Sequence, residues 1–228
     1  MKFLNIGRLR WVIHIILFSI SIASVLVVSS LKPTISFINQ MTIAFGYLSL
    51  GYLGVTLLIG PWQLLRNKHR RNPVNINLRR DIGIWAGITG IAHVVFGFQI
   101  HLGGDIIRYF FEKDQEGNWQ LALNLFGVSN IVGLSATVVL VLLLVLSNDI
   151  SLRVMKGKIW KNIQRLNYVL AVLVIAHTFG YQNVVNREGV MTLLVIFIAI
   201  AVLVFQVLGL NLYRRRQQFG SRRAKNTP

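Results

Sequence analysis

Residues 124–147 read NLFGVSNIVGLSATVVLVLLLVLS, a run without a single charged side chain. The hydrocarbon core of a bilayer is about 30 Å thick, so a helix that crosses it needs roughly 20 mostly apolar residues. Backbone amides and carbonyls find no water in lipid, and a helix bonds them to one another within one segment. We therefore predict that this run is a transmembrane helix.

Comparable apolar runs lie on both sides of this one, which gives six predicted spans. They fall near residues 11–30, 39–64, 82–102, 124–147, 165–184 and 191–213. The segments between them are too short for a soluble domain. The first run follows basic residues, as a signal peptide does, but it is longer than a signal core and shows no clear small-x-small cleavage site, so we predict a retained first helix. We predict an all-α membrane protein, a six-helix bundle forming a single domain over residues 1–228, with a basic tail at 214–228.

The composition fits this class of protein, and the positions of the charges predict its orientation. Hydrophobic residues make up 54% of the chain, yet the formal net charge is +17, which by itself would also suit a nucleic-acid binder. Twenty of the 24 Lys and Arg residues lie within residues 2–10, 66–80, 153–165 and 214–225. The other four are Lys32, Arg108, Lys113 and Arg187. The positive-inside rule therefore puts both termini in the cytoplasm. Because the charges alternate with the spans and form no single patch, we do not expect a nucleic-acid partner; the lipid bilayer is the expected one.

His93 and His177 are the ionisable residues deepest in two predicted spans. The chain has no cysteine, so histidine is the main candidate ligand for a metal or haem. Each histidine lies 12 residues beyond a boundary residue, Asp81 or Arg165, or about 18 Å along a helix. The third and fifth spans run in the same direction, so two imidazoles at matching depth could hold one planar cofactor from its two faces. The alternative is a hydrogen-bonded pair in the protein core.

Glycines accompany both histidines. Gly90 and Gly97 lie at i−3 and i+4 from His93, and Gly180 lies at i+3 from His177, so each shares a helix face with its histidine. A porphyrin lying against a helix needs such gaps. Small residues also let transmembrane helices pack closely, and the pattern leaves both interpretations open.

The segments around these histidines resemble the ferric-reductase-like transmembrane domain. The resemblance rests on residues 78–97, LRRDIGIWAGITGIAHVVFG, and residues 146–177, LSNDISLRVMKGKIWKNIQRLNYVLAVLVIAH. It covers roughly residues 40–185. The family includes a bacterial branch, the haem-binding subunit of the periplasmic methionine sulfoxide reductase. The resemblance implies haem b between the third and fifth helices, with His93 and His177 as the axial ligands of the outer of two possible sites.

The sequence departs from the family pattern at the inner site. Family members usually carry two histidines 13 residues apart on the fifth helix, and Gln164 stands at the first of these positions. Two-haem members place a second histidine on the third helix, where this chain has Arg79 and Arg80. An amide is a poor haem ligand. The resemblance therefore implies one haem per chain.

Four further residues are weaker candidates for the site. His101 lies eight residues beyond His93, where it could bond a haem propionate, accept a proton from a quinol or simply be solvated. His14 could face a neighbouring helix as a ligand. Arg108 and Arg187 could pair with propionates, because guanidinium binds carboxylate bidentately, or be ordinary loop arginines.

We expect a b-type cytochrome that moves electrons within a bacterial inner (plasma) membrane. The chain has no sequence fingerprint of a FAD or NAD domain, so electrons would come from quinol or a separate reductase and pass to an outer-side acceptor protein. A transporter or membrane scaffold that binds no haem is the alternative. A third possibility is a haem-binding anchor for a partner protein.

Overall fold

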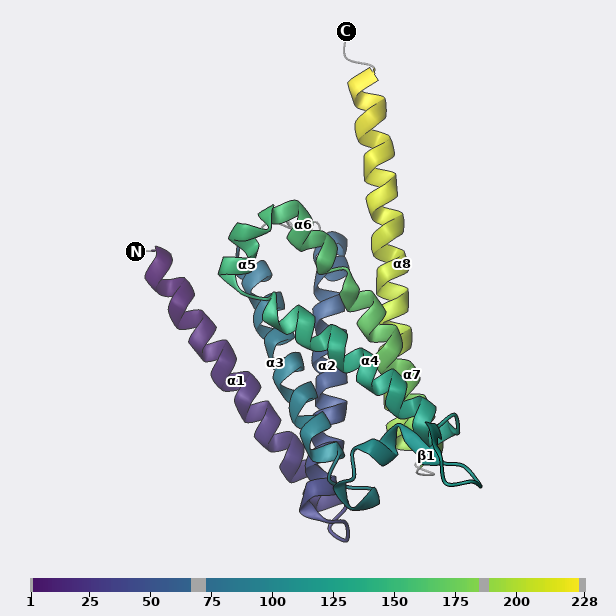
Figure 1. The fold of residues 1–228 in the computed structure, drawn as a ribbon. Helices are drawn as coiled ribbons and strands as arrows, with labels where there is room; N and C mark the ends of the chain where they lie inside the picture. Colours follow the sequence, from purple (N-terminus) through teal and green to yellow (C-terminus); the bar gives the residue numbers. More distant parts are fainter. Residues whose placement is uncertain (1, 67–72, 185–188, 226–228) are drawn as a thin grey trace.

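The computed structural model describes residues 2–66, 73–184 and 189–225. Its elements are α1 (Lys2–Leu31), α2 (Phe37–Leu65), α3 (Pro73–Gly97), the 3₁₀ turns η1 (Leu102–Gly104) and η2 (Ile107–Tyr109), β1 (Phe111–Lys113), β2 (Trp119–Leu121), α4 (Leu125–Val145), α5 (Asp149–Val154), α6 (Lys156–Ile163), α7 (Leu166–Val184) and α8 (Val190–Lys225). The long helices form one bundle, and the start of α1 and the end of α8 lie toward the same end of it (Figure 1).

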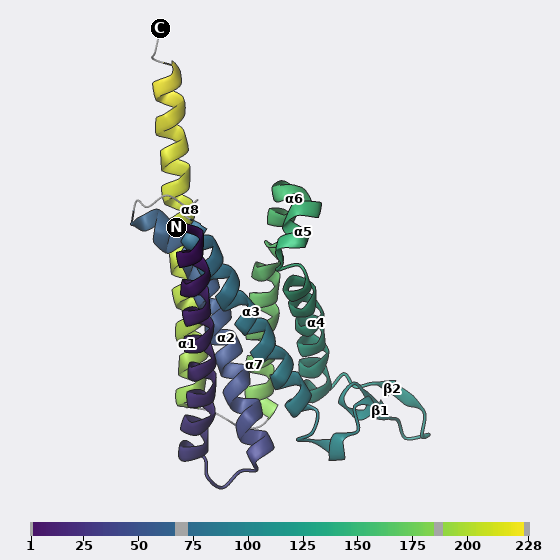
Figure 2. The same cartoon turned by 90° about the vertical axis from the view of Figure 1, so that its left-hand side faces the viewer.

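Helix α2 lies at the centre of the bundle. It contacts α1, α3, α7 and α8, whereas α4 packs mainly on α7 and also touches α3. Figure 2 shows α4 on the far side of α3 and α7 from α1 and α8. The site described below lies between two helix pairs, α2–α3 and α4–α7.

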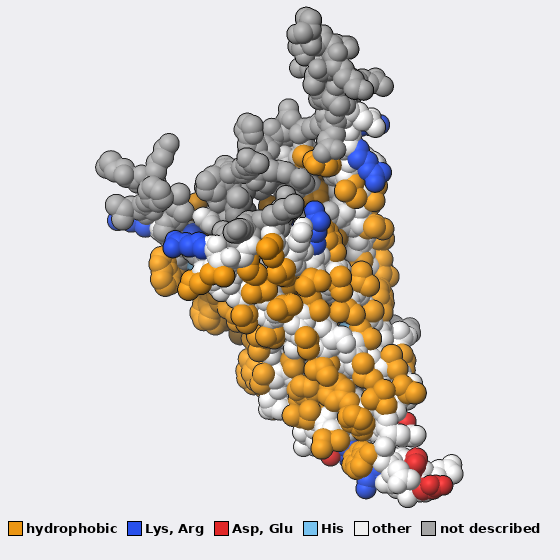
Figure 3. All heavy atoms as spheres, turned by 45° about the horizontal axis from the view of Figure 1, so that its top comes forward, with side chains coloured by type: hydrophobic (Ala, Val, Ile, Leu, Met, Phe, Trp, Pro, Cys, Tyr) orange, Lys and Arg blue, Asp and Glu red, His pale blue; other side chains and the backbone are white. Residues whose placement is uncertain are grey.

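The outer surface of the bundle is apolar, as a lipid-facing surface must be. Large hydrophobic side chains such as Trp11, Val138 and Phe197 are more than 60% exposed, and hydrophobic atoms cover the body of the molecule in Figure 3. Four helices of the described segments are long and apolar enough to cross a membrane: α1 over Arg8–Leu31, α2 over Phe37–Leu65, α4 over Leu125–Val145 and α8 over Thr192–Arg215. The prediction of an all-α membrane protein is confirmed at this level.

Helices α3 and α7 are not among these four. Both carry polar residues along their length: α3 contains two arginines, an aspartate, a threonine and a histidine after its first turn, and α7 contains two asparagines, a glutamine and a histidine. Such residues dilute the hydropathy of a helix whose polar side faces other helices. The predicted spans at 82–102 and 165–184 therefore stay predictions.

The ends of several helices differ from the predicted ones. Helix α3 begins at Pro73 and ends at Gly97, not at 82 and 102, because proline suits the first turn of a helix and the chain turns back after Gly97. The hydroxyl of Tyr109, a residue only 2% exposed, lies within 3.2 Å of the carbonyl oxygens of Gly97, Phe98 and His101. One of these carbonyls can accept its proton, and the hydroxyl itself accepts a hydrogen bond from the backbone N–H of His101 at 2.9 Å, so Tyr109 holds the turn that follows α3.

Three further features lie outside the six predicted spans. A short antiparallel hairpin pairs β1 with β2, with Phe111 opposite Leu121, at the end of the bundle opposite the chain termini (Figure 1). The segment between the predicted spans at 124–147 and 165–184 contains α5 and α6. Helix α8 continues to Lys225, so most of the predicted basic tail is helical.

A buried ion pair joins α1 to α3. Asp81 has a side chain that is 0% exposed and accepts two hydrogen bonds from Arg10, at 2.7 Å from Nη2 and 3.1 Å from Nε. His14 Nε2 lies 3.7 Å from the same carboxylate, and His14 Nδ1 accepts a hydrogen bond from Trp85 Nε1 at 3.0 Å. We call Arg10, His14, Asp81 and Trp85 the Asp81 cluster. The bidentate arginine compensates the charge of a carboxylate that would otherwise be costly to bury.

Candidate functional site

A cavity of about 190 Å³ lies between the α2–α3 and α4–α7 pairs. Its walls come from residues 39–53 of α2, 90–97 of α3, 130–140 of α4 and 170–182 of α7. At the end of the bundle that carries the hairpin, which we call the hairpin end, it is lined by Phe98, Ile100, His101, Tyr109 and Phe110. Pockets that are mainly apolar with a few placed polar groups are typical of cofactor sites.

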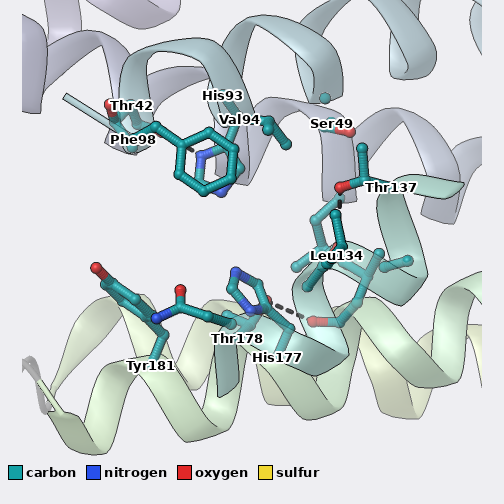
Figure 4. Close-up of a pocket in the computed structure, with 18 of the residues that line it drawn as sticks. Thr42, Ser49, His93, Val94, Phe98, Leu134, Thr137, His177, Thr178 and Tyr181 are labelled. Atoms are coloured by element: carbon teal, nitrogen blue, oxygen red, sulfur yellow. Dashed lines mark hydrogen bonds between the residues drawn. The ribbon is translucent and has the colours of Figure 1, made fainter. Parts of the chain in front are cut away.

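His93 and His177 face each other across this cavity. His93 projects from α3 and His177 from α7, and they enter the cavity from opposite sides (Figure 4). The centroids of the two rings are 6.2 Å apart, and their planes are inclined by 75°. The two histidines at matching depth, inferred from the sequence, are neighbours in the structure.

A backbone carbonyl of a neighbouring helix orients each ring. His93 Nδ1 lies 2.8 Å from the carbonyl oxygen of Thr42 on α2, and His177 Nδ1 lies 2.8 Å from that of Ser129 on α4. A carbonyl oxygen can only accept a hydrogen bond, so each Nδ1 carries the proton and each Nε2 keeps its lone pair. This is the tautomer in which histidine ligates a metal through Nε2.

A glycine stands one helical turn after each of these carbonyls. A Cβ placed on Gly46 would lie 2.8 Å from His93 Nδ1, and one placed on Gly133 would lie 2.7 Å from His177 Nδ1. In a helix the carbonyl of residue i already accepts from the amide of residue i+4. Glycine at i+4 leaves the second lone pair of that carbonyl open to the histidine.

The same arrangement of a carbonyl, a glycine and a histidine therefore occurs twice. Helix α2 presents Thr42 and Gly46 to His93, and α4 presents Ser129 and Gly133 to His177. We call each combination of a carbonyl and the glycine four residues later a clamp. Sequence reasoning missed both clamps. The signal in the sequence is a small residue four positions after a threonine or serine, in TIAFG and SNIVG, and it gains meaning only beside a histidine on another helix.

The glycines singled out from the sequence occupy two kinds of place. Gly90 and Gly97 line the cavity. A Cβ on Gly90 would come within 2.6 Å of Leu140, and one on Gly97 would meet only Thr42, at 3.6 Å. Gly180 instead faces the Ser129 side chain, so it lets α7 approach α4 closely.

His101 belongs to an aromatic group at the hairpin end of the cavity. Its ring centroid lies 6.5 Å from Tyr109, 5.8 Å from Phe126 and 5.9 Å from Tyr181. Tyr181 in turn packs on His177 with centroids 5.7 Å apart. Ring contacts thus connect His101 to one of the facing histidines.

The remaining candidates lie away from the cavity. His14 belongs to the Asp81 cluster, between α1 and α3. Arg108 is exposed and is not part of the cavity wall, and Arg187 lies outside the described residues. Gln164 follows α6, where its side-chain oxygen accepts a hydrogen bond from Asn167 Nδ2 at 3.2 Å.

The donor set at the cavity fits a haem iron. Within residues 2–66, 73–184 and 189–225, no group of three or more histidine or acidic side chains could hold a metal ion. Imidazole nitrogens lie about 2 Å from a first-row metal, and the ring centre is about 1 Å further, so two rings on opposite faces of one iron have centres roughly 6 Å apart. The observed separation is 6.2 Å.

One protein-family model matches the part of the chain that forms most of this site. The model described as "Ferric reductase like transmembrane component" matches residues 42–175, more than half of the 228-residue chain. The match includes both clamps and His93 and ends two residues before His177, while α1 and α8 lie outside it. No curated protein matches the sequence.

Proposed function

The chain belongs to the family of ferric-reductase-like transmembrane components, and from this premise we propose that it binds one haem b between His93 and His177 and carries electrons within the membrane. The observation that supports this most directly is the pair of clamps. They turn the Nε2 lone pairs of two neutral imidazoles toward one cavity, at a spacing suited to a single iron.

A bound haem and the protein would have different roles at this site. A bound haem supplies one-electron redox chemistry, while the protein sets its ligands, depth and surroundings. His93 and His177 would bind the iron from its two faces. Thr42 and Ser129 hold the rings in one orientation, and apolar side chains such as Leu53 and Leu170, which are at most 5% exposed, keep water from the cavity wall.

We further propose one haem rather than two. Gln164 stands 13 residues before His177, where two-haem members carry a histidine, and its side-chain oxygen already accepts a hydrogen bond from Asn167. Arg79 and Arg80 stand at the matching place on α3. These side chains offer no second pair of imidazoles.

The proposed topology is six spans with both chain ends in the cytoplasm. It is supported by the shared location of the chain ends and by the Lys and Arg side chains toward that end, with Asp and Glu near the hairpin (Figures 1 and 3). In this orientation His93, four residues before the end of α3, lies nearer the outer face. Electron transfer slows steeply with distance, so a donor within the bilayer and an acceptor on the outer side suit this depth.

The donor is therefore proposed to be membrane quinol or a separate reductase, and the acceptor an outer-side protein. The membrane is proposed to be a bacterial inner membrane, with the haem-binding subunit of the periplasmic methionine sulfoxide reductase as a functional model. Reduction of the purified protein by a quinol, compared with NADH plus a flavin reductase, separates the two donors. Reduction by the second system alone would rule out the quinol.

The central test is an absorption spectrum of the detergent-purified protein with haem quantification. We expect a low-spin b-type spectrum and one haem per chain. A colourless preparation that also fails to bind added haem would overturn the proposal in favour of a transporter or scaffold. Two haems per chain would overturn the interpretation of Gln164.

A further inference from the structure

Two amide side chains in the cavity wall have polar atoms without a hydrogen-bond partner. Asn130 Nδ2 on α4 and Gln182 Oε1 on α7 are both buried and have no partner among the described residues, and both residues line the cavity. Gln182 is only 6% exposed. Buried polar groups in folded proteins are nearly always satisfied, so a pair left open in one cavity indicates a ligand that satisfies them.

Both amides lie on the hairpin-end side of the facing histidines. Gln182 is five residues beyond His177 on α7, about 7 Å further toward that end. Asn130 precedes Gly133 by three residues on α4, which runs in the opposite direction, and so it lies about 4 Å nearer the same end. The two open groups are therefore displaced from the histidine pair in the same direction.

Gln182 can present a donor as well as an acceptor. Its Nε2 lies 2.8 Å from the hydroxyl of Tyr47. The two ends of an amide are nearly indistinguishable in shape, and a tyrosine hydroxyl can donate as readily as it accepts. If Tyr47 donates to Gln182 Oε1, the NH₂ group of Gln182 takes the open position. Asn130 and Gln182 then both offer N–H donors.

We propose that Asn130 and Gln182, the latter oriented by Tyr47, form the seat for the carboxylates of the bound haem, with those carboxylates directed to the hairpin end. This inference rests on the proposed function and adds the residues that recognise the polar edge of the cofactor. A carboxylate in an apolar cavity needs hydrogen-bond donors. Of the two arginines expected in this role, Arg108 is exposed and does not line the cavity, and Arg187 lies outside the described residues.

The test compares protohaem with its dimethyl ester, in which both carboxylates are neutralised. Full-length protein, freed of haem and reconstituted with each form, is mixed with excess apomyoglobin, and the rate of haem transfer is followed spectroscopically. We expect Asn130→Leu and Gln182→Leu to lose protohaem about tenfold faster than the wild type, the scale of a hydrogen bond to a charged group, and to lose the ester at the wild-type rate.

Asn183→Leu is the matched control, because Asn183 is next to Gln182 on the same helix but exposed, with its amide bonded to the carbonyl of Phe179. It should change neither rate. Should a leucine variant fail to fold, Asn130→Asp places a like charge against the carboxylate and should speed loss of protohaem more than loss of the ester.

If the leucine variants lost both haem forms faster by the same factor, or lost neither faster, Asn130 and Gln182 would not bind the carboxylates. The proposal that the protein binds haem would still stand. A wild-type protein that binds neither form would overturn the proposed function, and the seat with it.

Discussion

The α2–α3 and α4–α7 pairs each present one histidine to the cavity, and they differ in what surrounds them. The first pair is flanked by α1, and its central helix α2 also contacts α8. Its helix α3 carries Asp81, at 0% exposure, whose bidentate partner Arg10 lies on α1. In the second pair, α4 has only 17% of its most apolar segment buried, and it contacts mainly α7.

The histidine geometry is nevertheless the same in both pairs, with an identical hydrogen-bond length of 2.8 Å. The orientation of each ring is therefore set locally, by one carbonyl and one glycine. The stability of the helix pair is set separately, by its packing and ion pairs. Variants of the clamps should thus have matching effects in the two halves, and variants of the surrounding contacts should not.

The largest effect is expected from removing either ligand. We predict that His93→Ala and His177→Ala each abolish the low-spin haem spectrum, because one imidazole cannot supply both axial positions. The measurement is absorption of the purified protein with haem quantification. If one variant kept a full low-spin spectrum, the two halves would not be equivalent and another side chain would have to replace the missing ligand.

The next largest effect concerns the ion pair between α1 and α3, on the side of the α2–α3 half. Arg10→Leu leaves the Asp81 carboxylate buried without its main partner and should lower the free energy of unfolding by about 3 kcal/mol, measured by denaturant titration in detergent. Arg8→Leu is the control, since Arg8 is exposed two residues earlier. The haem spectrum of the folded fraction should stay unchanged. If Arg10→Leu lowered the free energy of unfolding no more than Arg8→Leu does, the ion pair would add nothing to the stability of the protein.

A smaller effect, equal in the two halves, is expected from filling the clamps. Gly46→Ala and Gly133→Ala each put a methyl group within 3 Å of a histidine ring, and the ring must shift at a cost of about 1–3 kcal/mol. Both variants should release haem about tenfold or more faster than the wild type. Gly51→Ala on α2 is the control, because nothing lies within 4 Å of its added Cβ. Unequal release rates would break the equivalence of the clamps.

The smallest effect is expected at the end of α3. Tyr109→Phe removes the hydroxyl that lies against three carbonyls, at a cost of about 1 kcal/mol in stability. Burial raises the pKa of this phenol above its ordinary value, so unfolding favours its ionisation. Wild-type stability should therefore be independent of this group at neutral pH and fall above about pH 10, and the variant should lose part of that fall. If the stability of Tyr109→Phe fell at alkaline pH as much as that of the wild type, ionisation of Tyr109 would not be a cause of the fall.

The sequence predicted those parts of the fold that depend on one helix at a time. Hydropathy located four runs that form helices long and apolar enough to cross a membrane, α1, α2, α4 and α8. Residue counting from Asp81 and Arg165 predicted that the two histidines lie at one depth, since a straight helix converts residue number into distance.

What the sequence did not predict depends on register between helices. The clamps need a carbonyl on one helix to lie opposite a histidine on another, which no single-helix pattern specifies. The sequence leaves His14 open as a ligand, whereas the structure gives it Trp85 and Asp81 on α3 as partners. The hairpin strands have three residues each, too few for an alternating pattern to be recognised.

The carbonyl oxygens of Thr42 and Ser129 that hold the two histidine rings cannot exchange protons with them. A peptide oxygen has no proton to release at any working pH, unlike a carboxylate that might hold the same imidazole. Thr42 and Ser129 therefore fix the protonation of His93 and His177 without joining in acid–base exchange. In the proposed haem site, these two imidazoles would therefore take up no proton when the iron is reduced. A compensating proton would have to bind elsewhere than on His93 and His177.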